Sequence, residues 1–267
     1  MALKYGCSTL LWGGHSLETA LEGIKAAGYE AIELCSIPGM GANHLPDDAS
    51  DADVAALMEM IEDHGLAIDS VGASTNLLNP EARERFLRVM ERAAKAGAPA
   101  IATGPGGVSD DEESFAETVR TIDDLARRAA ALGVKLALKP HHSSAAYNTP
   151  TALRLMAEVD TQWVHLNFDA SHILRAGEDP VESLRQLAAH VGNARIRDAK
   201  TVVKGIPPLE DQVCGGGLMD LPGLVREMRG IEQLKFVVLE IVGANGLPVD
   251  SIQSLADRSI RYLRAIV

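Results

Sequence analysis

The sequence predicts an α/β protein of the (β/α)8 TIM barrel class, with residues 1–267 forming a single domain. Short aliphatic runs alternate eight times with longer segments of helical period, which is the pattern of parallel βαβ units. Glycine ends several helical segments immediately before the next aliphatic run, as in "ALGVKLAL". No linker rich in proline, serine or charge divides the chain. A doubly wound open sheet is the alternative.

The expected elements follow each other in a regular order. The expected strands are residues 4–8, 31–35, 67–72, 100–104, 135–139, 164–169, 194–198 and 236–240. The expected helices are residues 17–27, 51–64, 81–96, 112–132, 151–159, 181–190, 222–228 and 251–266. Ser16, Ser50 and Thr149 are expected to cap helices, because their side chains can accept a hydrogen bond from a free backbone amide. Gly28 and Gly133 are expected to end helices.

Composition and charge narrow the classes of function. Hydrophobic residues make up 46% of the chain, but no apolar run approaches the ~18–20 residues that cross a bilayer. A formal net charge of −12 opposes binding to nucleic acid or to an anionic membrane. The three cysteines are widely spaced, which argues against a disulfide framework or a structural zinc site. We expect a cytoplasmic protein without an export signal, whose partner is a small molecule.

Polar side chains stand at the predicted carboxyl ends of the strands. In a TIM barrel these ends carry the active site, whereas residues within the strands mainly pack. The stretch "LALKPHH" places an ammonium and two imidazoles where an aliphatic strand stops. A charge at the end of a buried strand is costly unless it is paired, so Lys139, Asp169 and Glu240 are expected to meet. The candidate residues are Glu33, Lys139, His141, His142, Asp169, His172, Arg195, Arg197 and Glu240.

Several short motifs in this order resemble the xylose isomerase-like barrels of the sugar phosphate isomerase/epimerase superfamily. The motifs are "GYEAIEL", "LGVKLALKPHH", "NFDASH", "ARIRDAK", "CGGGLMDLPGL" and "FVVLEIVG". The resemblance implies a TIM barrel that acts on keto sugars. It also implies a divalent metal bound by a Glu, an Asp, a His and a Glu from strands five to eight, which holds the sugar and stabilises an enediolate.

In this chain the four implied positions carry Lys139, Asp169, Arg195 and Glu240. Charged lysine and arginine only donate hydrogen bonds and cannot ligate a cation, so we expect no metal cofactor. The two side-chain cations would replace the +2 charge of the ion in an alternating Lys139–Asp169–Arg195–Glu240 ring. Two alternatives stay open. The strand-seven alignment could be shifted, giving a metal-dependent epimerase that binds manganese or magnesium, or a metal could bind through the histidines of "KPHH" and "DASH".

We therefore expect a metal-independent isomerase, epimerase or dehydratase for a small keto sugar or keto polyol. Lys139 and Arg195 would polarise the carbonyl group, and Glu240 would remove the neighbouring proton. A neutral Lys139 could act as a second acid or base, or could form a Schiff base. The alternative from another class is a non-catalytic sugar-binding or regulatory barrel. A homodimer or homotetramer is left open.

The expected substrate contacts come from the other strand-end residues. The resemblance implies a substrate contact for the histidine of the D-x-x-H motif. Pro140 turns the chain out of the fifth strand, so at least one of the two histidines after it should point into the mouth of the barrel. The expected substrate-binding residues are Glu33, His141, His142, His172 and Arg197.

Overall fold

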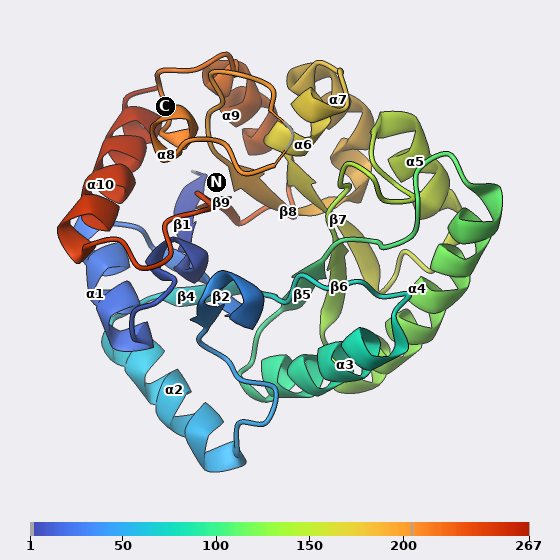
Figure 1. Cartoon of the computed structure of the whole chain (residues 1–267), viewed down its shortest axis with the longest axis horizontal. Helices are drawn as coiled ribbons and strands as arrows, with labels where there is room; N and C mark the ends of the chain where they lie inside the picture. Colours follow the sequence, from blue (N-terminus) through green and yellow to red (C-terminus); the bar gives the residue numbers. More distant parts are fainter. Residues whose placement is uncertain (1–2, 204, 267) are drawn as a thin grey trace.

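A computed structural model describes residues 3–203 and 205–266. Within these residues, eight parallel strands form a closed barrel surrounded by helices (Figure 1). The first strand, β1, pairs with both β2 and β9, which closes the ring and rules out the open sheet. The predicted TIM barrel is confirmed. The barrel strands are β1 (Lys4–Ser8), β2 (Ala31–Ile37), β4 (Ala67–Gly72), β5 (Ala100–Thr103), β6 (Lys135–Leu138), β7 (Val164–Asp169), β8 (Val191–Ile196) and β9 (Phe236–Leu239).

The helices lie close to their expected positions, with two short additions. Helices α6 and α8 follow β7 and β8 and were not predicted. A two-residue strand, β3 (Ala42–Asn43), pairs antiparallel with the end of β2. The helices are α1 (Leu17–Ala27), α2 (Asp51–Asp63), α3 (Pro80–Lys95), α4 (Glu112–Leu132), α5 (Thr149–Glu158), α6 (Ala170–Arg175), α7 (Pro180–Leu187), α8 (Leu209–Gln212), α9 (Leu221–Arg229) and α10 (Val249–Ala265).

The helix ends confirm most of the expected caps. Ser16 accepts a hydrogen bond from the Thr19 amide, and Ser50 forms a reciprocal capping box at the start of α2. Gly28 and Gly133 end their helices in the left-handed conformation. Thr149 is a correction. It is the first residue of α5, because the side chain of the preceding residue, Asn148, caps the helix instead.

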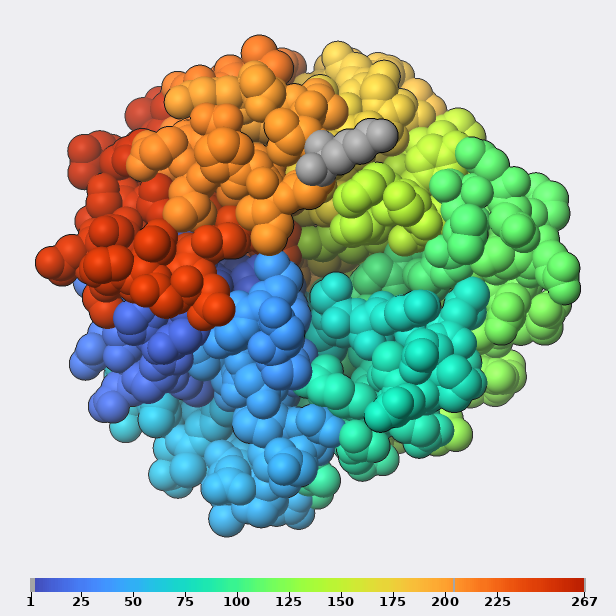
Figure 2. All heavy atoms as spheres, in the orientation of Figure 1, coloured from blue at the N-terminus to red at the C-terminus, as the bar shows by residue number. Residues whose placement is uncertain are grey.

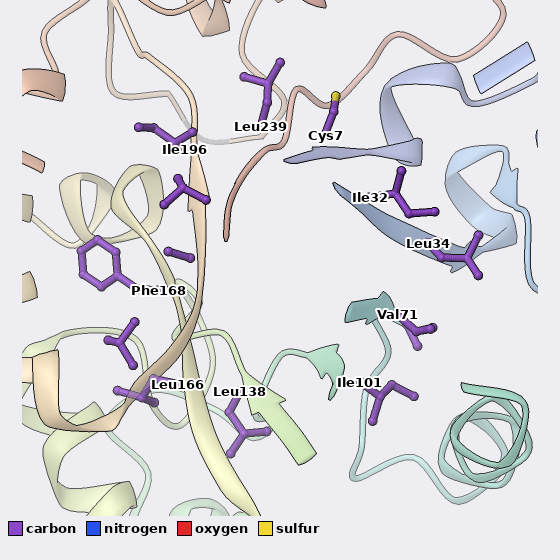
Figure 3. Packing of buried hydrophobic residues seen from close by; sticks show 14 of the residues in the cluster. Cys7, Ile32, Leu34, Val71, Ile101, Leu138, Leu166, Phe168, Ile196 and Leu239 are labelled. Atoms are coloured by element: carbon purple, nitrogen blue, oxygen red, sulfur yellow. The ribbon is translucent and has the colours of Figure 1, made fainter. Parts of the chain in front are cut away.

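Alternation along the strands separates apolar from polar side chains. Figure 3 shows apolar side chains such as Leu34, Phe168 and Ile196 on the side of the strands that faces the helices. Because successive residues of a strand point to opposite faces, their neighbours Glu33, Asp169 and Arg195 point toward the barrel axis. The main apolar core therefore lies between strands and helices.

Small side chains leave room inside one part of the barrel. Ala100, Ala102 and Ala137 form a separate buried cluster on β5 and β6. They share the inward face with Lys139, which follows the last residue of β6. Figure 2 shows a hollow near the middle of the molecular face, bordered by blue, teal and orange segments.

Strand β8 differs from its predicted position. It runs from Val191 to Ile196 because its first residue pairs with Leu166 of β7, three residues before the predicted start. Arg197 therefore lies just after the strand, at the level where Lys139 and Glu240 follow β6 and β9. Among the described helices, none combines the length and the apolar composition needed to cross a bilayer.

Candidate active site

A cavity of about 470 Å³ lies at the carboxyl ends of the barrel strands. Most of the predicted site residues meet there, although they come from distant parts of the chain. Asp169 and Arg195 are buried beside or beneath the cavity and do not line it. The predicted residues in its wall are Glu33, Lys139, His141, His142, His172, Arg197 and Glu240.

Lys139 lies between two buried carboxylates. Its Nζ is 2.5 Å from Oε2 of Glu240 and 3.2 Å from Oδ2 of Asp169. Burial alone would lower the pKa of Lys139, but the two carboxylates outweigh burial and raise that pKa above its ordinary value. Lys139 is therefore protonated at neutral pH. The expected lowering of the pKa of Lys139 by burial and Arg195 is therefore wrong, whereas an acid/base or Schiff-base role of Lys139 stays a prediction.

The two carboxylates differ in their electrostatic environment. Burial raises the pKa of Asp169, but the charges of Lys139 and Arg197 outweigh it and hold the pKa well below the ordinary value. Burial also raises the pKa of Glu240, and there the charge of Lys139 offsets only part of the effect. Asp169 is thus the more strongly stabilised anion, whereas Glu240 is the better proton acceptor.

Arg195 does not take the place that the sequence predicted for it. Its guanidinium pairs with Glu33 and, at 3.2 Å, with Asp69. It also donates a hydrogen bond of 2.8 Å to Ser70. Burial would lower the pKa of Arg195, but the charges of Glu33 and Asp69 raise it. These carboxylates hold Arg195 beneath the cavity, so the predicted ring with Arg195 between Asp169 and Glu240 is wrong.

Arg197, not Arg195, is the arginine that lies beside Asp169 in the wall of the cavity. It lies two residues beyond Arg195 on the same face of the chain, and its Nη2 is 3.8 Å from Oδ2 of Asp169. It donates to the backbone oxygen of Glu240 at 3.2 Å and to the hydroxyl of Ser171 at 2.7 Å. We define Lys139, Asp169, Arg197 and Glu240 as the mouth cluster.

Glu33 lines the cavity and also pairs with Arg195, which lies beneath the cavity. One carboxylate oxygen pairs with Arg195, and the other accepts a hydrogen bond of 2.7 Å from Ser8. Burial raises the pKa of Glu33, but Arg195 and Lys139 together lower it below the ordinary value. We define Glu33, Asp69, Ser70, Asn193 and Arg195 as the deep cluster.

Three predicted substrate-binding histidines lie together on one wall. The ring centroids of His141 and His172 are 4.2 Å apart, those of His141 and His142 are 4.4 Å apart, and those of His142 and His172 are 5.8 Å apart. Burial lowers the pKa of all three, and that of His172 lies well below the ordinary value. The three imidazoles are therefore neutral at neutral pH. We call them the histidine cluster.

Sequence reasoning missed three residues of the site or its support, namely Asn167, Asp69 and Ser171. Asn167 lines the cavity and is fully buried, yet neither polar atom of its amide has a partner among the described residues. Its position two residues before Asp169, on the same strand face, could have identified it. The signal for Asp69 was a charge inside the buried strand "AIDSVG". Ser171, inside the D-x-x-H motif, holds both Asp169 and Arg197 by hydrogen bonds.

The residues at the implied metal position do not fit a metal ion. The ammonium of Lys139 itself lies between Asp169 and Glu240. Arg195 stands at the position where the resemblance implies a histidine, and it is paired with other carboxylates. A divalent ion there would have two carboxylates as ligands and would be repelled by the neighbouring cations.

Comparisons with known proteins agree with this architecture. Residues 21–266 match the family described as xylose isomerase-like TIM barrel. An inosose dehydratase of Clostridium botulinum (strain Alaska E43 / Type E3) is 22% identical over 204 residues, or 70% of this chain. The match spans 64% of that relative's length, which is less than two thirds.

Solved structures with the same fold include a sugar epimerase and a zinc-binding protein. The crystal structure of the IOLI protein with a bound zinc atom aligns with a TM-score of 0.79 and 20% identity over 99% of both chains. The structure of D-psicose 3-epimerase in the presence of D-fructose aligns with a TM-score of 0.77 and 16% identity, also over 99% of both chains. At these identities the likeness establishes the fold.

Proposed function

This chain belongs to the xylose isomerase-like TIM barrel family, and we propose that it is an enzyme that removes a proton next to the carbonyl group of a small keto sugar or keto polyol. Isomerisation, epimerisation and dehydration all begin with this step. The observation that carries the proposal is the Lys139 ammonium held between Asp169 and Glu240 at the cavity. The names of the dehydratase relative and the epimerase of like fold support this class of substrate.

Glu240 is the proposed base. Its carboxylate lines the cavity, and burial raises its pKa above the ordinary value for glutamate. A raised pKa strengthens the carboxylate as a proton acceptor. The proton would pass from the substrate carbon to this carboxylate. A positioned base of this kind accelerates a reaction by roughly 10²–10⁴-fold.

Lys139 is the proposed electrophile. When the carbon loses its proton, negative charge develops on the carbonyl oxygen, and a fixed ammonium in a buried site stabilises that charge. Asp169 and Glu240 hold Lys139 in its protonated form, and Arg197 is anchored next to Asp169. The charge that a divalent metal would supply then comes from the chain itself. We accordingly propose a reaction that is independent of metal at this carboxylate pair.

The remaining cavity groups suit a polyhydroxylated substrate. The buried amide of Asn167 offers both a donor and an acceptor, and neither has a partner among the described residues. A sugar hydroxyl can satisfy both. A neutral imidazole of the histidine cluster also offers one donor and one acceptor, which suits a hydroxyl contact.

The proposal is tested by exchange of the carbon-bound proton with deuterium in D₂O, followed by NMR. This readout covers all three reaction types. A panel should include inosose, D-psicose and other keto sugars. We expect exchange in the wild type after exhaustive chelation, and losses of roughly 10²-fold or more in Glu240→Gln and Lys139→Met.

A matched control comes from the other end of the same strand. Lys135 begins β6, where its Nζ lies over the ring of Trp163 away from the mouth, and Lys135→Met should retain exchange. Strict dependence on added manganese, magnesium or cobalt would overturn the metal-independent proposal. Thermal stabilisation by panel sugars without any exchange would instead identify a binding barrel.

A further inference from the structure

We propose that His141, His142 and His172 form a binding site for one zinc ion, separate from the carboxylates of the mouth cluster. The site does not depend on the proposed function. Its ligands differ from the four positions, now Lys139, Asp169, Arg195 and Glu240, at which the likeness to xylose isomerase-like barrels implies metal ligands. The inference rests on geometry, on the state of the ring nitrogens and on the surrounding charges.

The geometry brings three ligand atoms together. One ring nitrogen from each histidine lies within 4.8 Å of the other two. Zinc binds imidazole nitrogen at about 2.0–2.1 Å, so tetrahedral angles place the bound nitrogens about 3.4 Å apart. Each pair therefore has to approach by at most about 1.4 Å. Small rotations of the imidazole side chains can provide that approach.

The tautomer of His141 leaves a free lone pair. Its Nδ1 lies 2.8 Å from the backbone oxygen of His142. A carbonyl oxygen only accepts, so the neutral ring must carry its proton on Nδ1 and present an unprotonated Nε2. Histidines that bind metals commonly donate their second nitrogen to a carbonyl in this way.

The other two rings contain buried nitrogens without a partner. Nδ1 of His142 and Nδ1 of His172 are buried and accept or donate no hydrogen bond within residues 3–203 and 205–266. His172 is only 5% exposed, and buried polar atoms are normally satisfied. Its Nε2 faces Oδ2 of Asp169 at 3.6 Å, which resembles the carboxylate–histidine pairing found behind many zinc ligands.

The surrounding charges permit a cation at the cluster. Lys139, Arg175 and Arg197 face the three rings and disfavour a positive ion. However, Lys139 is paired with Asp169 and Glu240, and Arg197 lies near Asp169, so these two charges are largely balanced.

The ligand type selects the metal. Imidazole suits zinc and neighbouring transition metals, whereas magnesium and calcium prefer oxygen ligands. Three histidines also match the usual number of protein ligands in zinc sites that keep one position open. The ligand type and number therefore suit zinc.

The test is calorimetric titration of chelator-stripped protein with zinc chloride at pH 7.5, supported by visible spectroscopy with cobalt(II). We expect one tightly bound ion per chain. His141→Gln, His142→Gln and His172→Gln should each weaken binding by about 100-fold or more, because losing a ligand should cost at least as much as losing a group that orients one. His64→Gln is the control, because its ring is bound to the Met60 carbonyl at the end of α2.

Three outcomes would overturn the site. These are no binding by the wild type, binding that survives all three cluster substitutions, or binding lost in Glu240→Gln but not in the histidine variants. Circular dichroism of each variant verifies that the fold persists. The titration needs no substrate, so it is independent of the outcome of the proton-exchange assay.

Discussion

The barrel contains two buried clusters of charge that differ in how completely their polar atoms are paired. In the deep cluster, Asp69 accepts hydrogen bonds from Arg195, Ser70 and Asn193, and Asn193 in turn accepts from His165. Around the mouth cluster, both polar atoms of Asn167 lack a hydrogen-bond partner among the described residues, and Oδ2 of Asp169 accepts no hydrogen bond although the Lys139 ammonium lies 3.2 Å away.

The more complete hydrogen bonding of the deep cluster is typical of a structural role, whereas polar groups without partners beside a cavity are typical of a binding site. Asp69, Asn193 and Arg195 beneath the cavity are at most 6% exposed, so they must find most of their partners within the protein. Groups at the mouth face a cavity, where a ligand can complete their hydrogen bonds. We infer that the deep cluster holds the barrel interior together and positions Glu33, whereas the mouth cluster is prepared for a substrate.

Arg195→Met should produce the largest change in stability. It leaves Glu33 and Asp69 buried without their countercharge, which costs about 3–5 kcal/mol in the free energy of unfolding. Urea denaturation measures the loss. Arg88→Met is the matched control. Its guanidinium is 52% exposed and pairs with Asp47 at the surface, so its removal should cost less than about 1 kcal/mol. Equal costs for the two variants would break the distinction between the clusters.

Lys139→Met should change the pH dependence of the mouth cluster. Burial raises the pKa of Glu240, and Lys139 is the main influence that lowers it, so its removal raises this pKa further. A base acts only when ionised. The acid limb of the residual kcat/KM profile should therefore move to higher pH. An unchanged limb would show that Glu240 is not the base or that Lys139 does not act on it.

Asn167→Leu should have the smallest effect on stability. Removing a buried amide without partners should change the free energy of unfolding by less than about 1 kcal/mol, while KM for a sugar substrate rises. The matched variant in the deep cluster is Asn193→Leu. It removes one of the hydrogen bonds that Asp69 accepts and leaves Nε2 of His165 without its partner, which should cost about 1–3 kcal/mol. A large loss from Asn167→Leu alone would reverse the interpretation of the two regions.

Much of the fold could be predicted because its signals are local. The alternation of strands and helices follows from short-range periodicity, and the capping side chains bind amides within three residues. The meeting of Lys139, Asp169 and Glu240 was also predictable, because charges at the carboxyl ends of buried strands around one barrel mouth need partners. Strand β8 was misplaced because its pairing with β7, not its own composition, determines where it begins.

The sequence by itself determined the barrel and the types of charge at its mouth, because strand periodicity assigns each residue to the core or to the axis. Only the tertiary structure decided which cation meets which carboxylate. Arg195 and Arg197 share one face of the chain, and the position of Glu33 and Asp69 directs the first below the cavity while Asp169 draws the second to the mouth. The histidine cluster likewise exists only because β6 and β7 are neighbours in the barrel.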